Sequence, residues 1–427
     1  MQHPHPRDRQ RPSRLTTYRS RQRARSHDEL HDGDHVAAAV LEHALVPAGE
    51  PVLVTDQRRT DELVERWREL GRFAFDTEFI GEETYYPQLC LVQVATPDAV
   101  VLLDPMAGLN LREFWSLVAD ASVEKIVHAG LQDLEPVVRH LDQPPRNVFD
   151  TQLAAGFAGL TYPMSLDKLV HALAGVDPAR GAKFSQWANR PLSPVQLGYA
   201  ANDVRYLLLL RDELGERLEA RGNTAWAQAR CDELSDRSLY EFDAQSQRLR
   251  VRGLEWMSAR QRAVLRTLTR WRDEAARAHD VPPRALLRDE LLVELSRTPR
   301  RSLQELAAVR GLPRPVQRQH GATLLTLTAE AMTRPLTPED APPVAPRRRP
   351  DPAAVEAWQA VETRCRDAGI DPAAVTSKRD FMTHWEAKRI GRASPLPRLI
   401  DGWRRDLLGH LLDLPPHAQI RGEPEPA

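Results

Sequence analysis

The sequence lacks several features that mark particular classes of protein. It has no apolar run of about 18 residues, the length that a membrane-spanning helix needs. Its N-terminus is rich in arginine, but no apolar segment follows, as one would in a secretory signal. Its three cysteines, Cys90, Cys231 and Cys365, lie far apart without metal-ligand spacing. We therefore expect a cytoplasmic protein with no membrane contact, no structural zinc and no disulfide framework.

Lysine is also scarce, since only five of the 59 basic residues are lysine. Such a bias reflects genomic coding more than function, so arginine richness alone decides little. The net charge of −1 conceals an asymmetry between segments. Residues 50 to 225 hold 17 basic and 26 acidic residues, whereas residues 255 to 333 hold 14 and 9. An acidic segment can hold cations and a basic one can contact phosphates, although charge also varies between domains by chance.

The length of 427 residues predicts two to four compact units. An unperiodic Arg-rich start reads as a disordered tail, and a segment with seven prolines reads as a stiff linker. The expected division is a tail at 1 to 45, an α/β domain at 46 to 225, a connector at 226 to 254, a helical domain at 255 to 333, the linker at 334 to 352, a second helical domain at 353 to 415, and a tail at 416 to 427.

The α/β domain alternates between strand and helix periodicity. The segments RFAFDTEFI, QLCLVQVAT and AVVLLD read as three strands, and the tight turn at Pro97-Asp98 makes them antiparallel neighbours. The segment KIVHAG reads as a buried strand that leads into a helix, and NVF as a short strand before another helix. The sheet is therefore expected to be mixed. Beyond residue 255 only amphipathic helices are indicated, so the C-terminal part is expected to be all-α.

Two acidic residues in the first of these strands suggest a cation site. Asp76 and Glu78 are two apart, so both carboxylates project from one face of the strand. The other face is expected to pack through Phe73, Phe75 and Phe79. Alone the pattern is weak, because a second Asp-x-Glu begins at Asp133 and such spacings arise by chance.

A well-specified helix start adds to the argument. Ser193 as N-cap, Pro194 at the first position and Gln196 form a capping box. Tyr199 and Asp203 then lie one turn apart on one helix face. They could equally be a packed tyrosine beside a solvated aspartate.

Asp133 completes the set, in the first turn of the helix after KIVHAG, where a helix N-terminus favours negative charge. Helix-end electrostatics alone would explain it equally well. Together the signals place four carboxylates and one phenol on elements that can converge at one end of the sheet.

At this point the sequence resembles a known family. FDTEFI with Asp76 and Glu78, HAGLQDLEPV with Asp133, and the segment with Tyr199 and Asp203 look like the three motifs of the tyrosine branch of the DEDD exonuclease superfamily. Their order, and YYPQLCLVQ after the first motif, resemble ribonuclease D. All five residue types are present. The resemblance implies a ribonuclease H-like fold and a 3′→5′ exoribonuclease that hydrolyses RNA from its 3′ end.

The resemblance also implies a two-metal mechanism with Mg²⁺ or Mn²⁺, which suits carboxylate ligands. By the family pattern, Asp76, Glu78 and Asp203 hold the metal that binds the attacking water, and Asp76 bridges to a second. Asp133 supports that second metal. Tyr199 orients the water, because a phenol with an ordinary pKa near 10 is a poor base at pH 7. His128 is expected to be a packed core histidine.

The segment around Trp271, Gly311 and the His320-Gly321 pair resembles the HRDC domain, a helical module of ribonuclease D and certain helicases. Its excess of basic residues suits phosphate contact, although solvated helix faces give the same charge. Residues 353 to 415 match a second, diverged HRDC-like domain more weakly.

Three functions remain open from the sequence. The family implies processing of tRNA precursors with 3′ extensions by a monomeric enzyme. A 3′→5′ DNA exonuclease would use the same carboxylates, although no polymerase or helicase motif accompanies them. A non-catalytic nucleic-acid-binding protein on this fold would be expected to lack at least one ligand, and none is missing.

Overall fold

The computed structural model describes residues 40–81, 83–178, 186–241, 254–342 and 351–413. The C-terminal tail, most of the N-terminal tail, and the centres of the connector and of the proline-rich linker lie outside these residues. Within the described chain, every helix is too short or too polar to cross a lipid bilayer.

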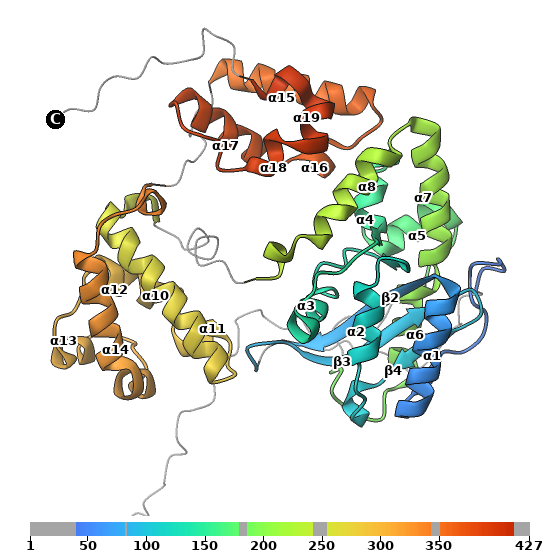
Figure 1. The fold of residues 1–427 in the computed structure, drawn as a ribbon, viewed down its shortest axis with the longest axis horizontal. Coiled ribbons are helices and arrows are strands. Elements are labelled where there is room, and N and C mark those ends of the chain that lie inside the picture. The colour runs from blue at the N-terminus through green and yellow to red at the C-terminus, as the bar shows by residue number, and fades with distance from the viewer. Residues whose placement is uncertain (1–39, 82, 179–185, 242–253, 343–350, 414–427) are drawn as a thin grey trace, which may run out of the picture. The chain divides into compact units, whose positions relative to one another are not determined.

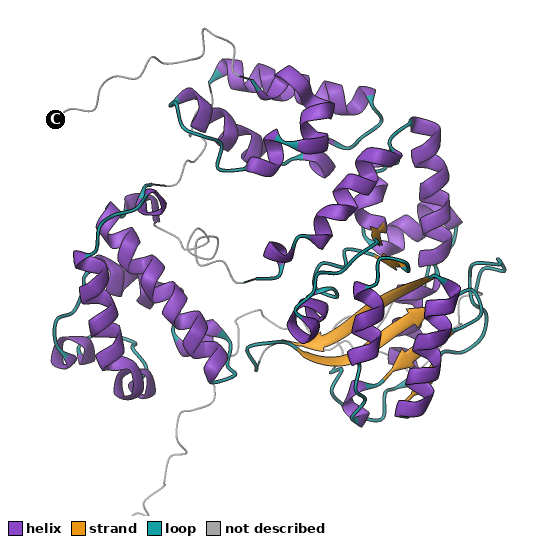
Figure 2. Ribbon diagram, in the orientation of Figure 1, coloured by secondary structure: helices purple, strands orange, loops and turns teal. Residues whose placement is uncertain are grey.

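A six-stranded mixed sheet forms the centre of the N-terminal domain (Figure 2). Its order is β1-β4-β3-β2-β5-β6. The strands are β1 (Val52–Val54), β2 (Arg72–Ile80), β3 (Gln88–Ala95), β4 (Val100–Leu103), β5 (Glu124–Val127) and β6 (Val148–Asp150). The pairs β2/β3 and β3/β4 are antiparallel, as expected, and the other three are parallel. The strand β2 is therefore central and paired on both edges.

Helices cover both faces of this sheet (Figure 1). They are α1 (Gln57–Leu70), α2 (Arg112–Ala119), α3 (Glu135–Leu141), α4 (Thr151–Phe157), α5 (Leu166–Ala174), α6 (Pro194–Arg205), α7 (Leu207–Arg221) and α8 (Thr224–Asp232). On one face Trp67, Phe73, Phe75 and Phe114 form an aromatic core beneath α1 and α2. On the other, Ala74 faces a core built by α4 to α7. The face that carries Ala74 is the one on which Asp76 and Glu78 also project.

The long helix that begins at Pro194 is interrupted. It ends at Arg205, and α7 begins at Leu207. The Arg205 guanidinium turns inward and donates to the carbonyls of Pro47 and Gly49. Gly222 ends α7 in the left-handed region with φ 68°. A glycine adopts this conformation without a steric penalty, as the sequence predicted.

The C-terminal part is all-α, as expected. One domain comprises α10 (Ala259–Ala278), α11 (Pro283–Leu286), α12 (Asp289–Arg297), α13 (Leu303–Ala307) and α14 (Arg314–Thr333), and has its own apolar core. The other comprises α15 (Pro352–Asp367), α16 (Pro372–Val375), α17 (Lys378–Arg389), α18 (Pro397–Ile400) and α19 (Gly402–Leu408). The buried residues of this last group continue the core of α4 and α7, where the rings of Phe157 and Trp403 lie 5.4 Å apart.

Candidate active site

The first two candidate residues lie in the middle of the sheet. Asp76 and Glu78 belong to β2, which is hydrogen-bonded to β3 on one side and to β5 on the other. The register between β2 and β3 shifts between Glu78 and Phe79, so a bulge follows the second carboxylate directly. Bulges change the direction of side chains near functional sites. The backbone therefore fixes both carboxylates on the face that α6 covers.

The helix α6 brings the next two. The capping box predicted at its start is present, because Ser193 Oγ accepts the Gln196 N–H at 3.3 Å and the Gln196 side chain accepts the Ser193 N–H at 3.0 Å. The helix packs against β2, β3 and β4. Tyr199 and Asp203 lie one turn apart on it, and the ring of Tyr199 lies 6.2 Å from that of Trp187.

Asp133 reaches the site from a turn, not from a helix as predicted. The strand β5 ends at Val127 and α3 begins only at Glu135. The turn between them is held by the carboxylate of Asp150, which accepts the N–H groups of Ala129 and Gly130, each at 3.0 Å. The hydroxyl of Thr77 donates to Asp133 Oδ1 and so links the turn to β2.

The electrostatics show that these residues share one environment. Burial raises the pKa of Asp76 well above its usual range, and the charges of Asp133, Asp203 and Glu78 raise it further. Burial, then Asp203 and Asp133, raises the pKa of Glu78 to about 8. Burial raises the pKa of Asp133 to about 6. The structure thus brings the four carboxylates close enough to repel one another.

Tyr199 belongs to the same environment. Burial raises the pKa of its phenol, and Asp203, Glu78 and Asp76 raise it further. The phenol therefore stays protonated at neutral pH, where it can donate a hydrogen bond but cannot serve as a base.

The donor chemistry of the site fits hard divalent cations. Carboxylates are the ligands that Mg²⁺ and Mn²⁺ prefer, and a bound cation would offset both the burial and the repulsion that raise the pKa values of Asp76 and Glu78. Within the part of the chain that the structure describes, no three His, Cys, Asp or Glu side chains already surround a single point.

The raised pKa of Glu78 predicts how the stability of the metal-free protein depends on pH. The folded state holds a proton up to about pH 8, whereas the unfolded chain loses it near its ordinary pKa of about 4.3. The stability that Glu78 contributes is therefore complete at acidic pH and is lost as the pH rises through 8.

We expect metal-free Glu78→Gln to melt about 3 °C or more above the wild type at pH 8.5, with the difference vanishing near pH 4.5. Thermal melts in EDTA measure this, with the exposed Glu83→Gln as control. If the melting temperatures of the wild type and of Glu78→Gln changed with pH in the same way, the pKa of the Glu78 carboxyl would not be raised in the folded protein.

Two structural residues near the site, Arg190 and Asp104, could not be predicted from the sequence. Arg190 makes two hydrogen bonds of 2.6 Å to the buried carboxylate of Asp104 and one of 2.8 Å to the carbonyl of Cys90. It also donates to the Trp187 carbonyl at 2.7 Å, so it ties the segment before α6 to the sheet. Arg190 and Asp104 are 86 positions apart, and no local pattern pairs them.

His128 is packed, as predicted. Its Nδ1 lies 2.9 Å from the Thr151 hydroxyl and its Nε2 lies 3.1 Å from the Met164 carbonyl. Both ring nitrogens are therefore engaged away from the carboxylates.

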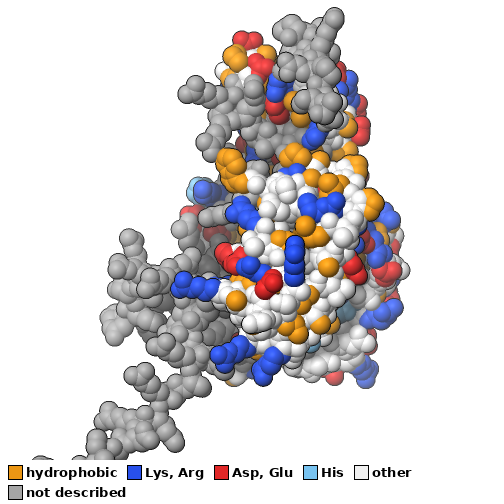
Figure 3. Space-filling model, turned by 90° about the vertical axis from the view of Figure 1, so that its left-hand side faces the viewer, with side chains coloured by type: hydrophobic (Ala, Val, Ile, Leu, Met, Phe, Trp, Pro, Cys, Tyr) orange, Lys and Arg blue, Asp and Glu red, His pale blue; other side chains and the backbone are white. Residues whose placement is uncertain are grey.

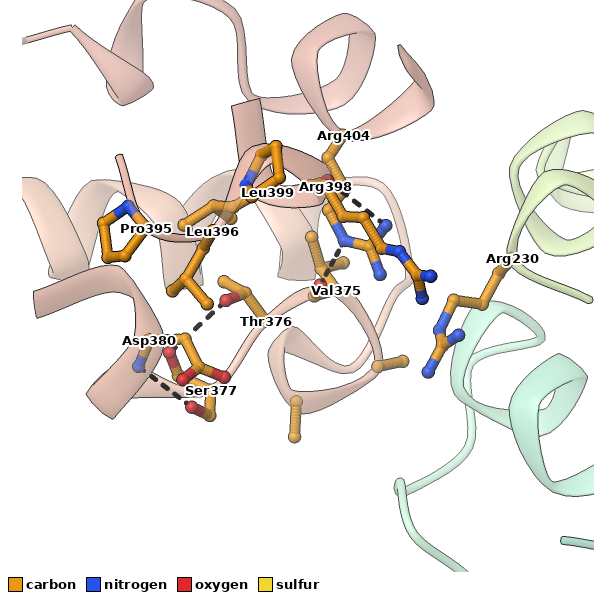
Figure 4. Close-up of a pocket in the computed structure, with 13 residues that line it drawn as sticks. Arg230, Val375, Thr376, Ser377, Asp380, Pro395, Leu396, Arg398, Leu399 and Arg404 are labelled. Atoms are coloured by element: carbon orange, nitrogen blue, oxygen red, sulfur yellow. Dashed lines mark hydrogen bonds between the residues drawn. The ribbon is translucent and has the colours of Figure 1, made fainter. Parts of the chain in front are cut away.

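A cavity of about 400 Å³ lies away from these carboxylates, between α8 and the turns around α16 and α18. Figure 4 shows Arg398 and Arg404 pointing toward Arg230. All three arginines are paired, because Arg230 and Arg404 both pair with Glu233 and Arg398 pairs with Asp236.

Comparison with known proteins places this arrangement in a family. A model of the 3′-5′ exonuclease family matches residues 51–219, and one of the HRDC domain matches residues 261–328. The ribonuclease D of Gluconacetobacter diazotrophicus is 35% identical, over 84% of this chain and 91% of that protein. The chain belongs to the ribonuclease D family.

Solved structures agree with this assignment. The crystal structure of Escherichia coli ribonuclease D, described as an exoribonuclease involved in structured RNA processing, is 29% identical and covers 85% of this chain and 98% of its own, with a TM-score of 0.70. A further relative by sequence, the ribonuclease D of Pseudomonas paraeruginosa, is 32% identical over 86% of this chain and 98% of its own. The comparisons confirm the predicted α/β exonuclease domain with a mixed sheet, followed by an HRDC domain. The second, diverged HRDC-like domain at residues 353 to 415 stays a prediction.

Proposed function

We propose that this member of the ribonuclease D family is a 3′→5′ exoribonuclease that removes nucleotides from RNA 3′ ends with two bound divalent cations, Mg²⁺ or Mn²⁺. The observation that carries the proposal is the cluster of buried carboxylates that raise one another's pKa beside a protonated phenol. Natural folds rarely keep such repulsion unless a cation relieves it.

Each side chain then has a role. The cations supply an activated water, neutralise the scissile phosphate and stabilise the leaving oxygen. Asp76, Glu78 and Asp203 would hold the cation beside the attacking water, with Asp76 shared by both cations. Asp133 would hold the second. Tyr199 donates a hydrogen bond that orients the water, since its raised pKa excludes proton abstraction.

Thr77 is expected to position Asp133, because its hydroxyl donates to that carboxylate. Thr77→Val keeps the shape and removes the donor, so the turnover of RNA should fall about tenfold. Thr77→Ser keeps the hydroxyl and should restore most of the rate. Steady-state rates across a Mg²⁺ titration measure both variants. Equal turnover in Thr77→Val and the wild type would show that Asp133 does not need this bond.

The HRDC domain supplies exposed positive charge for the RNA backbone. Six of its arginines are exposed and form no ion pair within the described chain: Arg270, Arg288, Arg301, Arg310, Arg314 and Arg318. On the face of the molecule drawn in Figure 3, basic side chains are spread among uncharged ones, with some acidic side chains between them. Such a surface suits contact with phosphates without base specificity.

We further propose that the substrates are tRNA precursors with 3′ extensions and that the enzyme acts as a monomer in the cytoplasm. The relative from Escherichia coli is described as processing structured RNA. The three cysteines are buried and unpaired, which suits a reducing compartment.

One experiment tests the activity and its substrate. The protein is incubated with 5′-labelled single-stranded RNA, the matching DNA, and a 3′-extended tRNA, each with Mg²⁺, Mn²⁺ or EDTA. We expect a ladder of RNA products shortened from the 3′ end in either metal and no cleavage in EDTA. Faster cleavage of DNA would favour the DNA exonuclease instead, and intact RNA in all conditions would leave only nucleic-acid binding.

A further inference from the structure

A fully buried glutamine lies beside the candidate active site. Gln93 is the last residue of the segment YYPQLCLVQ and belongs to β3, and its side chain is shielded from solvent. Within the ranges that the structure describes, neither its amide nitrogen nor its amide oxygen has a hydrogen-bond partner. A buried amide without partners costs free energy, so folded proteins contain few of them. The fold alone therefore gives no reason for an amide at this position.

The register of the sheet places this amide opposite the first candidate carboxylate. Gln93 pairs with Asp76 of β2 on one side and with Leu102 of β4 on the other. Side chains of directly opposed residues project from the same face of an antiparallel ladder, with their Cβ atoms about 5 Å apart. Of the two partners, only Asp76 carries a group that accepts a hydrogen bond. A glutamine is long enough to bridge this gap, so its amide can reach the carboxylate without a movement of the backbone.

Apolar residues of the core adjoin Gln93. Leu91 and Ala95 flank it on the same face of β3, and α6 packs against this face with the buried residues Ala200 and Val204. Such surroundings exclude water and strengthen any hydrogen bond that forms within them. The direction of the carboxylates is therefore the one in which this amide finds a partner.

A metal-binding carboxylate needs a donor that fixes its orientation, and the carboxylates that bind metals in proteins usually have one. Asp133 has such a donor in the hydroxyl of Thr77. The requirement is strictest for Asp76, because it is the carboxylate proposed to be shared by both cations. An amide N–H suits this role, since it donates without adding a charge and without losing its proton at any physiological pH.

We propose that Gln93 is a positioning residue, whose amide N–H donates to the carboxylate of Asp76 and holds it in the orientation that both cations require. The free energy that the unpartnered amide costs is recovered when this bond forms, so the bond and cation binding favour each other. The inference rests on the proposed two-metal function. It adds to that function a residue that contacts neither the cations nor the RNA.

The test uses Gln93→Met, which keeps the length of the side chain and removes the amide. Gln93→Glu keeps the shape but replaces the N–H donor by an oxygen. Leu102→Met is the matched control, because Leu102 is the other cross-strand partner of Gln93 and is equally buried. Mn²⁺ binding to each full-length protein, without RNA, is followed by the EPR signal of the free ion. Thermal melts in EDTA and steady-state rates with a 5′-labelled RNA at saturating Mg²⁺ are measured on the same proteins.

We expect Gln93→Met to weaken each Mn²⁺-binding step of the wild type about tenfold and to lower kcat about tenfold, with KM for RNA unchanged. In EDTA the same variant should melt about 3 °C above the wild type, because it no longer buries an unpartnered amide. A residue that only fills the core would not combine weaker metal binding with a higher melting temperature. Gln93→Glu should lose at least as much kcat, and Leu102→Met should match the wild type in Mn²⁺ affinity and kcat.

Equal Mn²⁺ affinity in Gln93→Met and the wild type, or an equal loss in Leu102→Met, would overturn the assignment. So would tighter Mn²⁺ binding with a wild-type kcat in Gln93→Glu, since the oxygen of Gln93 would then be a metal ligand itself. A wild type that binds Mn²⁺ but never shortens RNA would refute the proposed function instead, while the Mn²⁺ affinities would still test Gln93.

Discussion

Asp76→Ala is expected to lower the rate of RNA shortening by about 10³-fold or more without unfolding the protein. Asp76 is the carboxylate on which the charges of Asp133, Asp203 and Glu78 all act, so it is the ligand best placed to be shared by two cations. Glu78→Ala should have a comparable effect. Gel assays of a 5′-labelled RNA at saturating Mg²⁺ measure the rate.

The stability of the variant is the control for this prediction. Burial, and then the charges of its neighbours, raises the pKa of Asp76, so removing this carboxyl relieves an unfavourable buried charge and metal-free Asp76→Ala should melt no lower than the metal-free wild type at pH 8. Added Mg²⁺ should raise the melting temperature of the wild type more than that of the variant. A variant that retains a near wild-type rate would remove Asp76 from the site.

Tyr199→Phe is expected to lower turnover by about 10²-fold while the affinities for metal and RNA change little. The substitution keeps the ring that packs against Trp187 and removes only the hydroxyl. Because the raised pKa keeps this phenol protonated, the loss should be the same factor at every pH between 6 and 9.

Tyr206→Phe provides a matched control, since Tyr206 is buried directly after the end of α6. It should leave turnover unchanged. If Tyr199→Phe were equally silent, Tyr199 would be only a packed residue, and the metals alone would activate the water. A loss confined to high pH would instead indicate that the phenol must ionise.

What could be predicted from the sequence was local. The antiparallel β2/β3/β4 arrangement follows from strand periodicity and a two-residue turn, and the start of α6 follows from a capping box within four residues. The spacing of four residues on this helix also placed Tyr199 and Asp203 on one helix face. These elements carry three of the four carboxylates.

What could not be predicted depends on contacts between distant residues. The turn that carries Asp133 takes its shape from Asp150, which is 20 positions from Gly130. Lys125 lies within the predicted buried strand and is itself fully buried, with its Nζ donating to the carbonyl of Val123 at 2.7 Å. Nothing in the segment KIVHAG indicates that a lysine can be accommodated in this way.

The capping box of α6 fixes where the helix begins, so the number of residues between Ser193 and Tyr199 determines the direction in which Tyr199 projects. Since each helical residue turns the chain by about 100°, an alanine inserted between Gln196 and Tyr199 would rotate both Tyr199 and Asp203 away from β2. The helix itself would still form, because its cap would be intact. Such an insertion should abolish hydrolysis and also lower the melting temperature, because the buried Ala200, Ala201 and Val204 would rotate out of the core by the same angle. Most single substitutions on the exposed face of α6 should be tolerated. The site therefore depends on the number of residues between Ser193 and Tyr199 as well as on the identity of the side chains.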